Sequence, residues 1–172
     1  MGGRRSRLSS RDHGAAAVEF ALVVPLLLVL MFGIVDYGLW FGDSMNTRQG
    51  VDEGARQAVV KNFQGCSAEP NPAAQTACVV KARISPMAGE AYVRVEALPD
   101  PDAVGPQNWL EGGQLQVCAV VKATGLTGLT PMPNGGLISS AVSKRIEVDH
   151  DTPVPVYEDD LPAGATWAEP CT

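Results

Sequence analysis

The chain has 172 residues, 13 of them basic and 19 acidic, so its formal net charge at neutral pH is -6. This length allows one modest domain, and the negative charge argues against a general nucleic-acid-binding protein, which needs clustered positive charge to neutralise phosphates. The apolar residues are concentrated in one block, from Phe20 to Trp40, which indicates a protein that lies partly in a membrane.

The charges are unevenly distributed on the two sides of this block. Residues 1–14 carry four arginines and one aspartate, a net charge of +3, whereas the residues after Gly42 hold 9 basic and 16 acidic side chains, a net charge of -7. A basic segment before a single apolar span is retained in the cytoplasm. We therefore predict a single-pass membrane protein with its N-terminus in the cytoplasm and its C-terminal domain outside.

The apolar block has the length of one membrane-spanning helix. Residues Phe20–Val35 carry no charge, and extension to Trp40 gives about 20 residues, enough to cross a bilayer at 1.5 Å per residue. Pro25 inside the block predicts a kink. A cleaved secretory signal is the alternative, but the apolar run is longer than such signals have, and the small residues Ala15–Ala17 precede the run instead of following it.

Glu19 is a carboxylate at the start of this apolar stretch, where a charge is costly and by default suggests a function. One interpretation pairs it with a positive charge at the start of a neighbouring helix. If the chain were cut after Gly14, Ala15 would supply a new α-amino group, and an ion pair between copies would fix their register. The other interpretation places Glu19 at the inner headgroup level without a partner.

The run GAAAVEFALVVPLLLVLMFGIVDYG, residues 14–38, resembles the N-terminus of TadE-like proteins, the minor pilins or pseudopilins of bacterial tight-adherence (Tad) pilus systems. The resemblance is carried by a glycine before the cut, a glutamate followed by an aromatic residue, a proline six residues later and a closing acidic and glycine cluster: Gly14, Glu19, Phe20, Pro25, Asp36 and Gly38. It continues after the span in Glu53, Gly54, Ala55 and Arg56, and returns weakly in residues 139–148.

The resemblance implies cleavage by a prepilin peptidase between Gly14 and Ala15, which would leave 158 residues, and a role for Glu19 in subunit docking. It implies other pilin or pseudopilin subunits and membrane assembly proteins of the Tad system as partners, and no cofactor. A TadF-like role is a close relative of this interpretation, whereas a TadG-like protein would be much longer. The alternative from another class is an unprocessed membrane anchor that presents a disulfide-stabilised domain to an envelope or secretion partner.

Beyond Gly42 the pattern predicts that the membrane helix continues as an amphipathic helix. Its apolar positions fall on one stripe, which we expect to cover a sheet: Val51, Ala55, Ala58, Val59 and Phe63. Glycines 38, 42, 50 and 54 give two Gly-x-x-x-Gly spacings, which permit close packing either on another copy of the helix or on the chain's own sheet.

Alternating apolar residues predict strands at 91–98, 115–123 and about 141–148, separated by Pro/Gly-rich loops at 99–113 and 125–136. The central one is the most apolar. The expected fold is α+β and pilin-like: a long N-terminal transmembrane helix that continues as an amphipathic helix and packs on a small antiparallel sheet. The predicted segments are a leader (1–14), a membrane helix (15–41), the outer domain (42–148) and a Pro-rich acidic tail (149–172).

Four cysteines lie on the outer side, where disulfides persist. Three connectivities are possible. We favour Cys66 with Cys78, which closes a short Pro/Asn/Ala loop, and Cys118 with Cys171, which ties down the tail. A metal site is the alternative, but the chain lacks a Cys-x-x-Cys spacing and has only two histidines.

The tail composition favours an extended or disordered segment. Its residues Asp149, His150 and Asp151 suggest a cation site only weakly, because neighbours in an extended chain point to opposite sides. The sequence contains no phosphate-binding loop, nucleophile elbow or zinc-protease motif. We therefore expect no enzyme activity.

Overall fold

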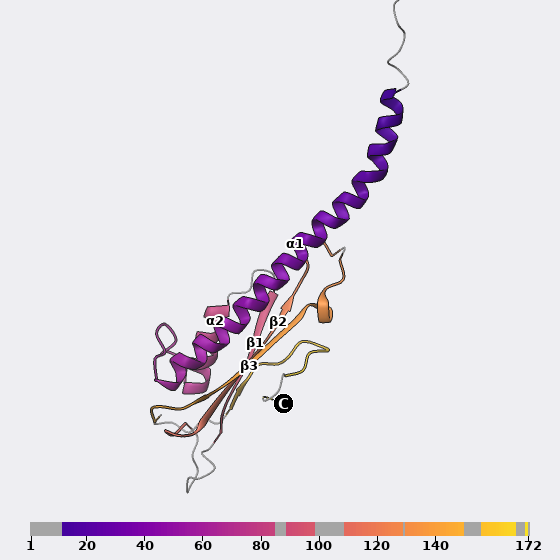
Figure 1. Ribbon diagram of the computed structural model, residues 1–172. Coiled ribbons are helices and arrows are strands. Elements are labelled where there is room, and N and C mark those ends of the chain that lie inside the picture. Colours follow the sequence, from indigo (N-terminus) through magenta and orange to yellow (C-terminus); the bar gives the residue numbers. More distant parts are fainter. Residues whose placement is uncertain are drawn as a thin grey trace, which may run out of the picture.

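The computed structural model describes residues 12–84, 89–98, 109–128, 130–149, 156–167 and 171. Its dominant element is helix α1, Asp12–Val59, whose 48 residues give a length of about 72 Å. The first half of α1 projects from one end of a folded domain, and its axis bends within the indigo part that contains Pro25 (Figure 1). A long apolar helix that continues into the folded domain is therefore confirmed.

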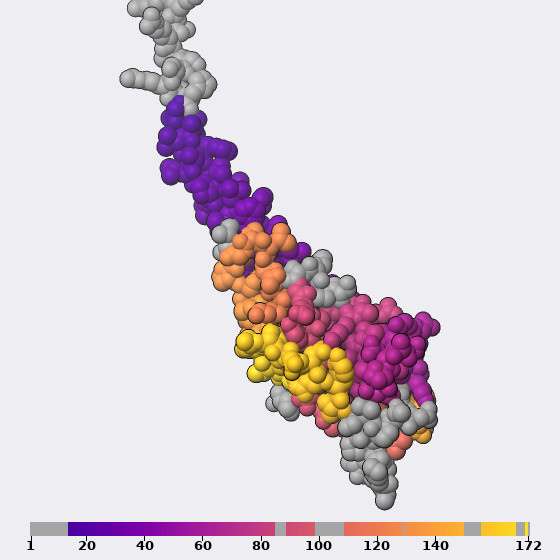
Figure 2. Space-filling model, turned by 180° about the vertical axis from the view of Figure 1, so that it is seen from behind, coloured from indigo at the N-terminus to yellow at the C-terminus, as the bar shows by residue number. Residues whose placement is uncertain are grey.

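The two halves of α1 have different environments. Between residues 14 and 35 every side chain is exposed or half-buried, and this part extends beyond the domain in the space-filling view (Figure 2). In the second half, the predicted stripe is buried: Val51, Ala55, Ala58, Val59 and Phe63 are between 0% and 9% exposed. Phe63 lies four residues past the end of the helix and still joins the core.

A second helix, α2, spans Pro72–Ile84 and packs against α1 and the sheet. The prediction of a loop between Cys66 and Cys78 is wrong from Pro72 onward. Asn71 caps the helix by accepting a hydrogen bond from the Ala74 backbone N–H at 2.8 Å, and proline is favourable in the first turn because the N–H that it lacks needs no partner there.

The sheet has four antiparallel strands in the order β3-β2-β1-β4: β1 is Gly89–Leu98, β2 Gln114–Ala123, β3 Leu137–Arg145 and β4 Val156–Glu158. The antiparallel α+β class is confirmed. The third strand lies earlier than predicted, because the 3₁₀ helix η1, Pro133–Gly136, turns the chain back directly into pairing with the end of β2.

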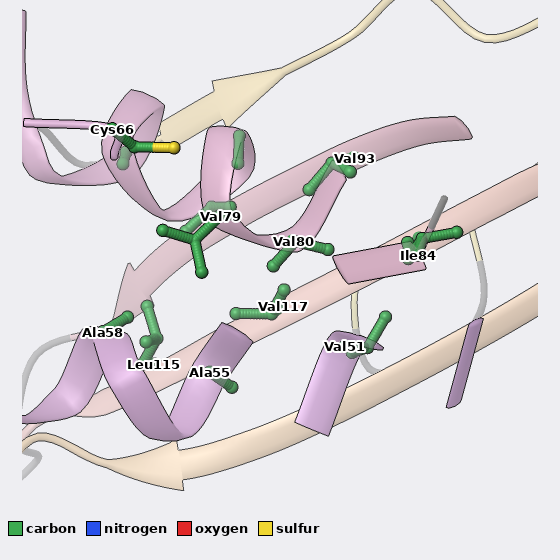
Figure 3. Packing of buried hydrophobic residues seen from close by; sticks show 14 of the residues in the cluster. Val51, Ala55, Ala58, Cys66, Val79, Val80, Ile84, Val93, Leu115 and Val117 are labelled. Carbon is green, nitrogen blue, oxygen red and sulfur yellow. The ribbon is translucent and has the colours of Figure 1, made fainter. Parts of the chain in front are cut away.

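The sheet is covered on both faces. Toward the helices, alternate residues of β1 and β2 form the main core with α1 and α2 (Figure 3), among them Val93, Val95, Leu115 and Val117. On the opposite face, Cys118 and Val120 of β2 pack with Trp167 and Cys171. Since both faces of β2 are buried, the central strand is apolar without a strict alternation.

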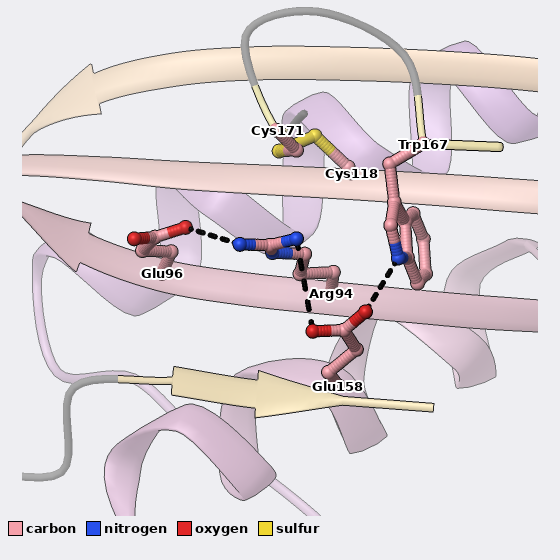
Figure 4. The surroundings of a disulfide bond; sticks show 6 residues. All are labelled: Arg94, Glu96, Cys118, Glu158, Trp167 and Cys171. Carbon is pink, nitrogen blue, oxygen red and sulfur yellow. Dashed lines mark hydrogen bonds and ion pairs between the residues drawn. A yellow bond between two sulfur atoms is a disulfide. The ribbon is translucent and has the colours of Figure 1, made fainter. Parts of the chain in front are cut away.

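Part of the predicted tail belongs to the folded domain. Strand β4 pairs with β1, Trp167 is 8% exposed, and its indole Nε1 donates a hydrogen bond to Glu158 at 2.7 Å (Figure 4). Lys81 of α2 adds an ion pair with Asp159 at 2.7 Å. The segment is extended, as its composition indicated, but residues 156–167 and 171 are packed on the sheet and do not form a separate tail.

Two disulfides join Cys66 to Cys78 and Cys118 to Cys171, the pairing favoured from the sequence. The first connects the segment after α1 to α2. The second fastens the C-terminal segment to the central strand, on the sheet face away from the helices (Figure 4). A small domain gains from such cross-links because its core is limited.

Candidate assembly site

Gly14 and Ala15, the predicted processing point, lie in the first turn of α1. Both are exposed. Within the described part of the chain, a Cβ atom placed on Gly14 would have no neighbour within 4 Å. The described packing of this chain therefore gives no reason for a glycine at this position.

Glu19 lies one helical turn after Ala15, about 6 Å along the axis. Its side chain is exposed, and the described residues provide it with no hydrogen-bond or ion-pair partner. Phe20 is 70% exposed, and Pro25 lies on the same uncovered part of the helix. These three residues belong to a surface that the chain itself leaves open.

Asp36 has the opposite environment. It is 0% exposed, although it lies on the same helix as the apolar span. Its carboxylate accepts hydrogen bonds from the loop between β2 and β3: from the Leu126 backbone N–H at 3.0 Å, from Thr127 Oγ1 at 2.6 Å and from Thr130 Oγ1 at 2.7 Å. These donors are all uncharged. The carboxylate thus fastens the loop between β2 and β3 to the middle of α1.

Neighbouring residues of α1 strengthen this attachment. The Tyr37 hydroxyl donates a hydrogen bond to the Pro131 carbonyl at 2.9 Å. At Gly33, an added Cβ would touch the Thr130 methyl group at 3.6 Å, which shows how closely the loop approaches the helix. Gly38, by contrast, has open space around it among the described residues.

The predicted motif that follows the span is divided between the core and the surface: Glu53, Gly54, Ala55 and Arg56. Ala55 is 0% exposed, and a Cβ on Gly54 would overlap Val80 of α2. Glu53 and Arg56 form an ion pair on the surface at 2.9 Å. The hydrogen bond from Arg56, followed by one from Gln57, lowers the pKa of Glu53 from 4.5 to about 2. Gly50 similarly packs against Ile84, so this Gly-x-x-x-Gly pair serves contact between α1 and α2 of one chain.

A comparison with known protein families finds a match for the N-terminal part of the chain. Residues 14–56 match the family model described as TadE-like protein. The part of the chain that is similar to this family is therefore the N-terminal helix. No curated protein and no solved structure gives a significant match to the chain.

The TadE-like match covers 43 of the 172 residues, a quarter of the chain. It begins at Gly14 and ends at Arg56, so it covers the exposed apolar half of α1, Asp36 with its hydrogen bonds, and the Gly54 contact with α2. The helix is also long and apolar enough to cross a membrane. The sheet lies outside the matched residues.

The sequence did not reveal the partners of Asp36. Thr127 and Thr130 lie 91 and 94 residues away, in a loop that carries no motif. The available signal was the loop's composition, which is rich in threonine and glycine and free of charge.

Two residues of the suggested cation site, His150 and Asp151, lie outside the described residues. Asp149 accepts a hydrogen bond from the Glu111 backbone N–H at 2.6 Å. Among the residues that the structure describes, no group of three His, Cys, Asp or Glu side chains is arranged to hold a metal ion.

Proposed function

We propose that the chain is a membrane-anchored minor pilin or pseudopilin that takes part in assembly of a Tad pilus. The observation that carries the proposal is the uncovered apolar half of α1 with Glu19 at its start, in a segment that matches the TadE-like family. Such a helix has two uses: it anchors the chain in lipid, and it packs laterally on the helices of other subunits.

Processing supplies the partner of Glu19 in this proposal. Cleavage between Gly14 and Ala15 by a prepilin peptidase removes the basic leader and leaves an α-amino group at the start of the apolar helix. Since Glu19 has no partner within the described part of its own chain, it is available to the amine of a neighbouring subunit. In a low-dielectric setting this ion pair offsets part of the cost of burying both charges, and it sets the stagger between helices.

The proposal places the N-terminus in the cytoplasm and the disulfide-linked domain outside the cytoplasmic membrane. Its partners are other pilin or pseudopilin subunits and the membrane proteins of the assembly apparatus. The role is structural, so we propose that the chain acts without catalysis and without a cofactor.

A substitution of Glu19 tests the proposal. We expect Glu19→Ala to leave membrane insertion and the disulfide-bonded domain intact, and to reduce surface pili or the recovery of the protein in cross-linked complexes with other subunits. Val18→Ala is the matched control, because Val18 is an adjacent residue with a 62% exposed side chain and no charge. Normal assembly by the Glu19→Ala chain would refute the docking role.

A further inference from the structure

A loop of the outer domain lies beside the membrane helix, at the level where the charge-free sequence ends. This membrane-proximal loop comprises residues 124–128 and 130–136, between β2 and β3. In Figure 2 the orange residues of this region cap the end of the domain from which the indigo helix emerges. Asp36 and Tyr37 hold the loop there through four hydrogen bonds.

The charge-free stretch before Asp36 is too short to cross a bilayer without help. Residues Phe20–Val35 number 16, which makes about 24 Å of helix. The hydrocarbon core of a bilayer is about 30 Å thick. An exposed carboxylate at position 36 would therefore limit how deeply the helix can sit, because a charge in hydrocarbon is costly.

Burial of the carboxylates on α1 removes this limit on the depth of the helix. Asp36 and Asp43 are the only charged residues between Glu19 and Arg48, and they are 0% and 1% exposed. The exposed surface of α1 is consequently free of charge from Phe20 to Thr47, which makes 28 residues or about 42 Å. Phe41 and Met45 on this added stretch are 60% and 62% exposed, as expected of residues that contact lipid.

The loop itself has the surface of a lipid contact. The sequence from Ala123 to Ser143 contains no charged residue. Leu126 is 72% exposed, more than any other large apolar residue described outside α1. A single exposed leucine is ordinary on a protein surface. Leu126, however, lies in a charge-free loop that is fastened to α1 where the charge-free sequence of the helix ends.

We propose that the membrane-proximal loop inserts Leu126 into the outer leaflet of the cytoplasmic membrane, so that the domain sits directly on the lipid surface. The proposal rests on the membrane anchoring proposed above. Asp36 gives the loop its position, because its hydrogen bonds hold the loop against the helix and keep the carboxylate away from lipid.

Depth-dependent fluorescence quenching tests this contact. All four native cysteines are in disulfides, so one introduced cysteine is the only free thiol. The full-length Leu126→Cys chain is labelled with an environment-sensitive fluorophore and reconstituted in phosphatidylethanolamine and phosphatidylglycerol vesicles. One set of vesicles carries nitroxide groups near the headgroup and a second set carries them deep in the acyl chains. Both leaflets are labelled in each set, so that the orientation of the protein does not matter.

Two further labelled chains provide the controls. Val60→Cys reports an exposed apolar position, 45% exposed, at the far end of α1, and Leu27→Cys reports the middle of the proposed span. We expect a blue-shifted, strongly quenched signal at position 126, and a red-shifted, unquenched one at position 60. Equal quenching at 126 and 60, with Leu27→Cys quenched by deep nitroxide groups, would overturn the loop contact alone. If deep nitroxide groups left the label at position 27 unquenched, the membrane anchor and the loop contact would be overturned together.

Discussion

The Asp36 carboxylate accepts a hydrogen bond from the Thr127 hydroxyl at 2.6 Å, across 91 residues of sequence. Together with the bonds from Leu126 and Thr130, it joins the loop between β2 and β3 to α1, at the end of the charge-free stretch of the helix. Because the acceptor is buried, the contact fixes the position of the loop against α1.

Loss of the Thr127 hydroxyl should loosen the loop. A hydrogen bond to a charged group contributes about 1.5–3 kcal/mol, so we expect Thr127→Val to weaken the attachment by an amount in this range. The Leu126 amide, which donates to the same carboxylate at 3.0 Å, should then exchange its hydrogen faster. Thr127→Ser retains the hydroxyl and serves as the control. Unchanged exchange at Leu126 in the valine variant would show that Thr127 does not hold the loop.

Gly54 should tolerate no side chain. A Cβ at this position overlaps Val80, a stiff branched residue on a packed helix, and such overpacking costs about 1–3 kcal/mol. The better helix propensity of alanine, about 1 kcal/mol, offsets part of this cost. We expect Gly54→Ala to lower the thermal stability of the outer domain. Gly38→Ala, in open space, should leave it unchanged or slightly raised, and equal destabilisation by both would contradict the close contact between α1 and α2.

The two disulfides should differ in their contribution to stability. They close loops with sequence separations of 12 and 53 residues, and the chain-entropy model gives the longer loop an advantage of about 1 kcal/mol. We expect the Cys118→Ser/Cys171→Ser double variant to unfold at a lower temperature than the Cys66→Ser/Cys78→Ser variant. The double variants avoid stray thiols. If the Cys66→Ser/Cys78→Ser variant unfolded at the lower temperature, the Cys118–Cys171 disulfide would add little to the stability that β4 and Trp167 already give the C-terminal segment.

The ion pair of Glu53 predicts a pH dependence. The pKa of Glu53 in the folded chain, about 2, lies below its ordinary value of 4.5. Its stabilising contribution is therefore complete above pH 4.5 and is lost as the pH falls toward 2. Glu53→Gln should lower the melting temperature at pH 7 and match the parent chain near pH 2. A Glu69→Gln chain, which changes an exposed carboxylate, controls for general charge effects. A difference that persists at pH 2 would exclude titration of Glu53 as its cause.

The periodic elements were predictable because their patterns are local. The long apolar run predicts the projecting half of α1, and the stripe from Val51 to Phe63 predicts its packed half. Alternation in residues 91–98 predicts which face of β1 meets the helices. The start of α2 also carried a local signal, Asn71 followed by Pro72, but the nearby prolines and Cys66 favoured a loop.

The features that escaped prediction depend on contacts between distant residues. Nothing near Asp36 indicates that a threonine 91 positions later will cover it. The composition of the C-terminal segment favours an extended or disordered tail, yet Trp167 bonds to Glu158 of β4 and Cys171 forms a disulfide with Cys118 of β2. Single anchoring residues thus determine order where the average composition points to its absence.

The central claim is that the chain is a processed, membrane-anchored pilin-type subunit. Intact mass and N-terminal sequencing of the protein from its native membrane, with and without reduction, test it most directly. The account predicts a chain that begins at Ala15 and gains about four mass units on reduction of its two disulfides. A chain in that membrane that retains residues 1–14 would contradict pilin-type processing and favour an unprocessed anchor that presents a binding domain.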